Sequence, residues 1–239
     1  MAIKETKKEK KSLKKKKGEV QKAVFGAELD FEATEAYNLL RTNIMLSMPS
    51  KNGGRIIGVT SSAPHEGKSY NSVNLAYSLA RNGSRTILIS GDMRKPTLET
   101  YFNESVTPGL SNVLSGQEEY SHVVRDLATH ENLFLLPAGN NPPNPSELIS
   151  SKDMQRLLDT LSKEYEYIIV DLPPISEVVD PIAVSPYLDG MIVVVNHGYT
   201  HRRLLAQSMK QLRFSGVRIL GFIYNGYRKH GNGYNRRYY

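Results

Sequence analysis

Six short apolar runs, separated by longer amphipathic stretches, constrain the fold more than any other feature of the sequence. The runs are "RIIGVT", "TILIS", "LFLLPA", "YIIVD", "MIVVVN" and "RILGFIYN", at residues 55–60, 86–90, 133–138, 167–171, 191–196 and 218–225. Several are apolar at consecutive positions, which is typical of strands covered on both faces of a sheet. Helical periodicity appears between them, at residues 67–82, 151–164 and 200–215. This alternation predicts an α/β fold with a doubly wound, mostly parallel sheet.

Length and composition favour one domain. At 239 residues the chain is long enough for one sizeable core, and we place the domain at residues 29–225, with a helix at its start over residues 30–48. The absence of cysteine excludes disulfides and thiolate metal sites. No apolar run approaches the roughly 20 residues of a transmembrane helix. We therefore expect a soluble protein that works in the cytoplasm.

The positive charge is confined to the N-terminus. Residues 1–18 hold nine lysines against two glutamates and so carry the whole net charge of +7. The remainder is formally neutral, which argues against a basic surface for nucleic acid. We predict a disordered, Lys-rich arm over residues 1–28. Attraction of this arm to an anionic membrane surface is an alternative, and contact with nucleic acid is a third.

The segment "SSAPHEGKS" joins the first apolar run to a predicted helix that begins near Lys68. Backbone N–H groups at such a turn, together with the helix N-terminus, form a cradle for phosphates. Gly67 would allow close approach of the backbone, Lys68 would reach the β- and γ-phosphates, and Ser69 would offer its hydroxyl to Mg²⁺. The predicted nucleotide-binding residues are Pro64, His65, Glu66, Gly67, Lys68, Ser69 and Tyr70.

This loop departs from the pattern G-x-x-x-x-G-K-[ST], because Ser62 stands at the first glycine position. A tight turn with an incidental lysine is therefore the alternative interpretation. The strand before the loop and the helix after it favour the phosphate cradle.

Two acidic residues end neighbouring apolar runs. "TILISGD" ends in Asp92, and "YIIVD" ends in Asp171. Since Mg²⁺ takes oxygen ligands, we predict that Ser69, Asp92 and Asp171 hold it, and that Lys68, Asp92 and Asp171 act in catalysis. The alternative is that each acid only closes a turn at a strand end. No guanine-reading N-K-x-D stretch occurs, so ATP is favoured over GTP.

The motifs together resemble those of the bacterial tyrosine kinases of capsule and exopolysaccharide synthesis and, more distantly, the MinD/ParA ATPases. The resemblance spans residues 30–239 and is carried by "SSAPHEGKS", "ISGDMRKP", "PPNPSELI", "IIVDLPP" and the terminal tyrosine cluster. The MinD/ParA group usually has a further lysine early in the loop, where this chain has Ala63. The residues of "PPNPSELI" by themselves predict only a rigid turn into a helix capped by Asn144 or Ser146.

The resemblance implies a P-loop nucleotide-binding fold with ATP and Mg²⁺ as cofactors. It also implies transfer of the γ-phosphoryl group to C-terminal tyrosines of a neighbouring subunit. The implied partners are a membrane-bound activator of the polysaccharide system and further copies of the chain, at the inner face of the cell membrane.

Residues 226–239 read as a flexible tail rich in tyrosine. The predicted acceptors Tyr227, Tyr234, Tyr238 and Tyr239 lie among glycine, asparagine and basic residues, where no core can form. Each phosphate adds about −1.5 to −2 at pH 7, so phosphorylation would reverse the sign of this basic tail. An incidental aromatic tail and nucleic-acid binding by interleaved Tyr and Arg are the alternatives.

Two departures from the family pattern bear on function. The family motif D-x-D-x-R reads Ser90-Gly91-Asp92-Met93-Arg94, so its first acid is missing. The oligomer motif E-x-x-R-x-x-R keeps Glu35 and Arg41 but has Asn38 in the centre. We therefore predict an impaired kinase that retains nucleotide binding, and a weakened oligomer with Glu35 and Arg41 at its interface. The alternative is a MinD/ParA-like ATPase switch, or a pseudokinase that binds ATP without phosphorylating tyrosine.

Overall fold

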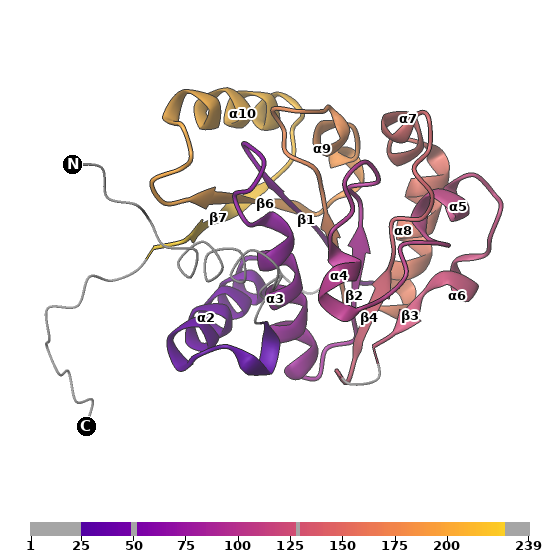
Figure 1. The fold of residues 1–239 in the computed structure, drawn as a ribbon, viewed down its shortest axis with the longest axis horizontal. Coiled ribbons are helices and arrows are strands. Elements are labelled where there is room, and N and C mark those ends of the chain that lie inside the picture. The colour runs from indigo at the N-terminus through magenta and orange to yellow at the C-terminus, as the bar shows by residue number, and fades with distance from the viewer. Residues whose placement is uncertain (1–24, 49–51, 128–129, 228–239) are drawn as a thin grey trace, which may run out of the picture.

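A computed structural model describes residues 25–48, 52–127 and 130–227. Within these ranges the strands form one sheet in the order β3-β4-β2-β5-β1-β6-β7 (Figure 1). All neighbours run parallel except β3, which is antiparallel to β4. The strands are β1 Arg55–Ser61, β2 Thr86–Ser90, β3 Arg125–Asp126, β4 Leu133–Leu136, β5 Tyr167–Asp171, β6 Gly190–Asn196 and β7 Ile219–Asn225. The fold is thus the predicted α/β class with a mostly parallel sheet.

Helices cover both faces of this sheet. Helices α2 and α3 lie on one face, and α8 and α10 lie on the other (Figure 1). The helices are η1 Gly26–Glu28, α2 Phe31–Ser47, α3 Lys68–Arg81, α4 Leu98–Phe102, α5 Leu110–Leu114, α6 Tyr120–Val123, α7 Pro145–Ile149, α8 Lys152–Glu164, α9 Asp180–Ala183, η2 Ser185–Tyr187 and α10 Arg202–Phe214. Among the described residues, none of these helices is both long and apolar enough to cross a membrane.

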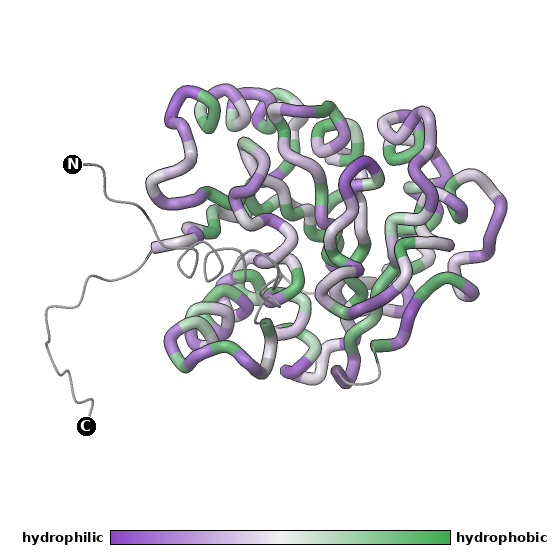
Figure 2. Tube along the Cα trace, viewed as in Figure 1, coloured by the Kyte–Doolittle hydropathy of each residue, from purple (hydrophilic) through white to green (hydrophobic). Residues whose placement is uncertain are grey.

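The central strands are buried on both sides, which explains their consecutive apolar residues. Successive side chains of a strand point to opposite faces. Ile56 therefore joins the core beneath α8 and α10, whereas Ile57 joins the core beneath α2 and α3. Hydrophobic residues, green in Figure 2, accordingly run along the central strands, while the outer loops are mostly hydrophilic.

The six predicted strands and the four long predicted helices are confirmed, with ends that differ by a few residues. The short helices α4, α5, α6 and α9 and the two-residue strand β3 were not predicted, whereas α7, which begins at Pro145 after the N-cap residue Asn144, is the helix expected after the rigid turn in "PPNPSELI". Elements of two to five residues are too short to show a hydrophobic period, so tertiary packing must define them.

The start of the domain differs from the expectation. Residues 25–28 were assigned to the arm, but Phe25 packs edge-on against Tyr101 and Phe102, with ring centroids 6.0 and 5.4 Å apart. The backbone N–H of Gly26 also donates to Asn74 Oδ1 at 2.9 Å. The domain therefore begins no later than Phe25. The remainder of the predicted arm lies outside the described residues.

The strand order brings three loops together at one edge of the sheet. Strand β5 pairs with β1 on one side and with β2 on the other. Asp171, the last residue of β5, stands opposite Val59 of β1 and Ser90 of β2. The loop after β1 and the segment after β2 therefore meet the end of β5.

Candidate nucleotide site

The loop between β1 and α3 has a shape that requires glycine at one position. Gly67 has φ of 91°, and a Cβ built on it would lie 2.1 Å from Asn225 Nδ2. Asn225 instead donates from Nδ2 to the carbonyl of Glu66 at 3.0 Å. The loop thus enters α3 with its backbone held closely, and the N-terminus of this helix favours bound anions.

Glu66 supports the loop from behind. Its side chain is fully buried, and Oε2 accepts from the backbone N–H groups of Ser62 and Ala63 at 2.8 and 3.1 Å. The other oxygen accepts from the hydroxyl of Thr200. The structure therefore places the Glu66 side chain beneath the loop and not among the groups that line the pocket, although we had predicted Glu66 to bind nucleotide.

The three predicted catalytic side chains meet at the end of β5. Lys68 Nζ lies 3.1 Å from Asp92 Oδ2 and 3.6 Å from Asp171 Oδ2. Burial lowers the pKa of Lys68, but the charges of Asp171 and Asp92 outweigh this effect and leave it above its ordinary value. Burial raises the pKa of Asp171, against the opposing effects of Lys68 and its hydroxyl partners. The lysine is therefore a stable cation at neutral pH.

Three hydroxyl groups surround these charges. Ser69 donates to Asp171 Oδ2 at 2.6 Å, and Ser72 donates to Oδ1 of the same carboxylate at 2.9 Å. Thr97 donates to Ser69 Oγ at 2.9 Å. Ser72 and Thr97 were not among the predicted site residues. Ser72 could have been found from the sequence, because it lies one helical turn after Ser69 and so on the same face of α3. Thr97 lies in a loop, and no sequence pattern indicates its position.

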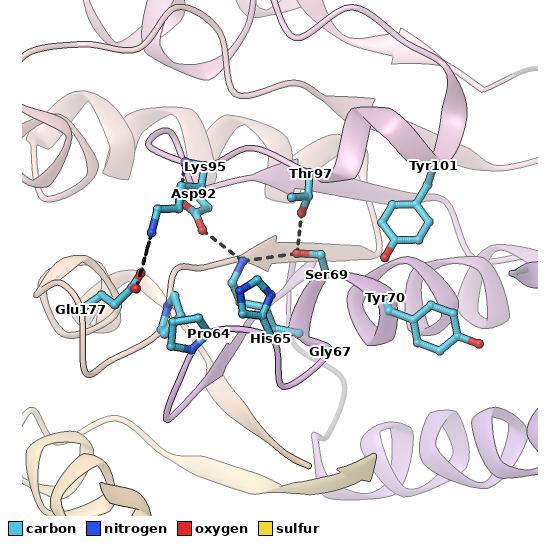
Figure 3. A pocket seen from close by; sticks show the side chains of 12 residues that line it. Pro64, His65, Gly67, Ser69, Tyr70, Asp92, Lys95, Thr97, Tyr101 and Glu177 are labelled. Carbon is cyan, nitrogen blue, oxygen red and sulfur yellow. Dashed lines mark hydrogen bonds and ion pairs between the residues drawn. The ribbon is translucent and has the colours of Figure 1, made fainter. Parts of the chain in front are cut away.

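Of these groups, Lys68, Ser69, Asp92 and Thr97 border a pocket of about 240 Å³ (Figure 3). Lys95 and Glu177 lie at one end of it, and Tyr70 and Tyr101 lie at the other. Lys95 Nζ is 3.5 Å from Glu177 Oε2. The lining residues are Pro64, His65, Gly67, Lys68, Ser69, Tyr70, Asp92, Lys95, Thr97, Tyr101, Pro174 and Glu177. Apart from Glu66, every predicted nucleotide-binding residue is among them, whereas Thr97, Tyr101, Pro174 and Glu177 were not predicted.

The oxygen groups at this pocket fit magnesium. Two carboxylates and the Ser69 hydroxyl are ligands that Mg²⁺ accepts, and it commonly combines one or two carboxylates with substrate phosphates. Within the described ranges, no group of three or more His, Cys, Asp or Glu side chains is placed to hold a metal by itself. The arrangement therefore fits a cation bound together with a phosphorylated ligand.

Ser90 stands beside this centre without a partner. Its side chain is 1% exposed, and its hydroxyl has no hydrogen-bond partner among the described residues. It lies opposite Asp171 in the sheet register. A side chain at this position is thus close to the carboxylates, as expected of the first acid in the family motif.

A second hollow, of about 550 Å³, lies between α2 and β7. Tyr70 lines both hollows, and Asn71, Asn225 and Tyr227 line only the second. The ring of Tyr227, a predicted acceptor, is 57% exposed and packs edge-on against His197. The predicted acceptors Tyr234, Tyr238 and Tyr239 lie outside the described residues.

The predicted interface residues share one side of α2. Asn38 donates to Glu35 Oε1 at 2.9 Å, and Arg41 donates to Asn38 Oδ1 at 3.1 Å. Arg41 also donates to the carbonyl of Ser78 at 3.0 Å, which ties it to α3. Glu35 is exposed and Arg41 is half-buried.

Comparison with known proteins agrees with this geometry. The family model of the AAA domain matches residues 54–213. The chain is 39% identical over 196 residues to the tyrosine-protein kinase CpsD of Streptococcus pneumoniae, which covers 81% of this chain and 84% of that protein. It is 35% identical over 193 residues to the tyrosine-protein kinase YwqD of Bacillus subtilis, which covers 81% of each chain.

Solved structures extend the comparison. The kinase domain of the Escherichia coli tyrosine kinase ETK has a TM-score of 0.79 at 28% identity, covering 94% of this chain and 90% of that one. The septum site-determining protein MinD of Pyrococcus horikoshii, solved with Mg-ADP, has a TM-score of 0.60 at 24% identity over 72% of this chain and 70% of that one, and shows likeness of fold. The chain belongs to the family of bacterial tyrosine-protein kinases.

Proposed function

We propose that this protein is an ATP-dependent tyrosine kinase that phosphorylates the C-terminal tyrosines of a neighbouring copy. The observation that carries the proposal is the meeting of Lys68, Asp92 and Asp171 beside the loop at Ser69. Phosphoryl transfer depends mainly on positioning and on charge stabilisation, and this centre offers both. The relatives named as tyrosine-protein kinases support the same activity.

Different residues would contact the phosphates, the cation and the nucleoside of ATP. The loop N–H groups and Lys68 would hold the phosphates, while Ser69, Asp92 and Asp171 would hold Mg²⁺. The cation, when bound, would neutralise charge on the phosphates. The hollow that Tyr70 shares with the pocket, lined by Asn71 and Asn225, offers space for the nucleoside.

In the transfer itself, the bond from the γ-phosphorus to the β-phosphate oxygen breaks and a bond to the tyrosine oxygen forms. The tyrosine proton must leave, and an acid at position 90 would be placed to take it. Ser90 is a poor base. General-base assistance typically contributes roughly 10²- to 10⁴-fold. We therefore propose a slow kinase in which the tyrosine proton leaves late.

The acceptors we propose are Tyr227, Tyr234, Tyr238 and Tyr239. Tyr227 is exposed at the end of the described chain, beside β7. The basic residues around the others would draw the unmodified tail toward the carboxylates of a neighbour. Phosphate would then reverse the charge of the tail and release it.

The proposed setting is regulation of capsular or extracellular polysaccharide synthesis and export. Relatives with names such as CpsD support this class of role. We propose a membrane-bound activator, a homo-oligomer weakened by Asn38, and a position at the cytoplasmic face of the membrane. The Lys-rich arm at residues 1–28 would add attraction to anionic lipid.

Radiolabelled ATP tests the activity directly. The purified chain, incubated with ATP and Mg²⁺, should acquire phosphotyrosine, located by mass spectrometry on the four tail tyrosines. Lys68→Met should remain unlabelled. Mixing Lys68→Met with a variant in which all four tyrosines are phenylalanine should label the Lys68→Met chain, because only transfer between copies can do so. Absence of phosphotyrosine in every mixture would refute the proposal.

A second candidate is a nucleotide-dependent switch or pseudokinase. The missing acid at Ser90 favours it, and the likeness of fold to MinD allows it. ADP release without any phosphotyrosine, in the same experiment, would identify a switch. Binding of ATP without either product would identify a pseudokinase.

A further inference from the structure

The segment at residues 142–149 meets the loop that follows β2. Helix α7 begins in this segment, and its N-cap residue Asn144 makes no side-chain capping bond. The hydroxyl of Ser146 instead donates to Asp180 Oδ1, at the start of α9. Arg94 donates from Nη2 to Ser146 Oγ at 2.9 Å. One serine thus joins three segments that are far apart in the sequence.

Asp180 gives this contact its strength. Its side chain is fully buried, and Oδ2 has no hydrogen-bond partner among the described residues. Arg94 Nε lies 3.6 Å from that oxygen. A buried carboxylate is costly unless it is paired, so Asp180 attracts the guanidinium of Arg94 and keeps it against α7 and α9, which lie side by side (Figure 1).

Arg94 is only two residues beyond Asp92. Between them, Met93 is 1% exposed and belongs to the core. Asp92 Oδ1 accepts from the backbone N–H of Lys95 at 3.0 Å, which closes a tight turn. The segment that carries Asp92 is therefore fixed by β2 at one end and by Arg94 at the other.

We infer that Arg94, Ser146 and Asp180 are positioning residues that hold the Asp92 carboxylate in place for the cation. None of the three lines the pocket, so they act on bound nucleotide only through Asp92. This inference rests on the proposed ATP–Mg²⁺ site. It gives the segment at residues 142–149 a role that its own sequence does not reveal.

Binding of ADP, measured with and without Mg²⁺, tests the inference without requiring kinase activity. Ser146→Ala removes the link while leaving Lys68 and the loop intact. Ser150→Ala is the matched control, since Ser150 is the exposed C-cap residue of the same helix and its hydroxyl donates to the carbonyls of Ser146 and Glu147.

The expected result is selective for the metal. Ser146→Ala should weaken the apparent Mg²⁺ affinity of the ADP complex by about 10-fold, as is usual for residues that orient metal ligands. Its affinity for ADP in EDTA should equal that of the unmodified chain. Ser146→Thr, which keeps a hydroxyl, should restore most of the loss. Arg94→Lys, which lacks the fork of donors, should behave like Ser146→Ala.

Several results would overturn the inference. One is an unchanged Mg²⁺ affinity in Ser146→Ala, and another is an equal loss with and without Mg²⁺. A similar loss in Ser150→Ala would also exclude the specific link. If the unmodified chain binds no Mg-ADP, the proposed function itself fails. If the unmodified chain binds Mg-ADP and the variants bind it equally well, the proposed function stands and only the inference about Arg94, Ser146 and Asp180 fails.

Discussion

The hydroxyl of Ser69 donates a 2.6 Å hydrogen bond to Asp171 Oδ2, although 102 positions separate the two residues in sequence. The contact exists because β1 and β5 are parallel neighbours, so the loop after one meets the last residue of the other. Ser69 and Asp171 are also two of the three groups that we propose for Mg²⁺. The same carboxylate is thus buried at the end of a central strand and belongs to the metal site that we propose.

Replacing Asp171 by asparagine should separate these two roles. Burial raises the folded-state pKa of Asp171 above its ordinary value of 3.8, so its charge costs stability at neutral pH. The contribution of Asp171 to the free energy of unfolding is greatest below its pKa in the unfolded chain. It falls as pH rises through its pKa in the folded protein. Asp171→Asn should therefore melt at or above the unmodified chain at pH 7, with phosphotyrosine formation abolished.

Thermal unfolding at several pH values checks this sign. The advantage of Asp171→Asn should shrink as pH falls toward 4, because the native carboxyl then becomes neutral as well. The ammonium of Lys68 should still pair with Asp92 in the variant, since Nζ lies 3.1 Å from Asp92 Oδ2 in the unmodified chain. A variant that melts several degrees lower at pH 7 would show that the charge pair outweighs burial.

Two glycines with the same backbone angle allow the shape of the loop to be tested. Gly67 and Gly83 both have φ of 91°, but a Cβ at Gly83 meets nothing within 4 Å. Both alanine variants should bear the strain of the left-handed region, about 1–2 kcal/mol. Gly67→Ala should lose at least ~1 kcal/mol more, because its methyl collides with Asn225. Urea unfolding measures both losses, and equal values would exclude the collision.

The positions of the acids were predictable because the sequence indicates parallel strands. Asp92 and Asp171 each follow an apolar run, and carboxyl ends of parallel strands share one edge of the sheet. The sequence did not indicate that β5 lies between β1 and β2, which is what brings both acids to Lys68. Strand order depends on how the helices pack across the sheet. The hydrophobic periodicity of a single strand or helix does not indicate it.

Contacts made by single polar side chains were beyond prediction. The bond from Ser146 to Asp180 and the bond from Thr200 to Glu66 each join segments that are distant in sequence. The packing of Phe25 on Tyr101 likewise leaves no periodic signal in the short stretch between the Lys-rich segment and α2. Such contacts depend on tertiary geometry, whereas periodicity reports only which face of an element is buried.

The buried carboxylate of Glu66 should tolerate glutamine but not alanine. Glutamine can turn its oxygen to the N–H groups of Ser62 and Ala63 and donate its amide to Thr200. Alanine leaves the buried N–H of Ser62 and the partly buried N–H of Ala63 without an acceptor, and a fully buried group in that state costs about 1–3 kcal/mol. Glu66→Ala should therefore unfold at lower urea concentration than Glu66→Gln, and should bind ADP more weakly. Equal midpoints would show that water replaces the carboxylate.

Restoring the missing acid should speed the reaction at a cost in stability. Ser90→Asp places a carboxylate beside Asp171, where it can accept the tyrosine proton, and we expect phosphotyrosine to form roughly 10²-fold faster or more. Because the new charge is buried near two others, the variant without nucleotide should melt lower. Ser90→Asn is the control for size. Equal labelling rates for all three chains would remove the argument for a base at this position.

Asn38 offers the corresponding test of assembly. It sits between Glu35 and Arg41 and bonds to both, so the guanidinium of Arg41 is used within its own chain. Asn38→Arg would supply a planar fork able to pair with a carboxylate across an interface, which asparagine cannot replace. We expect light scattering to show larger assemblies for Asn38→Arg than for the unmodified chain. Thr42→Arg, exposed on the same helix, adds the same charge outside the motif and should leave the mass unchanged. A stable octamer of the unmodified chain at micromolar concentration would contradict the weakened interface, since Asn38 would then suffice for assembly.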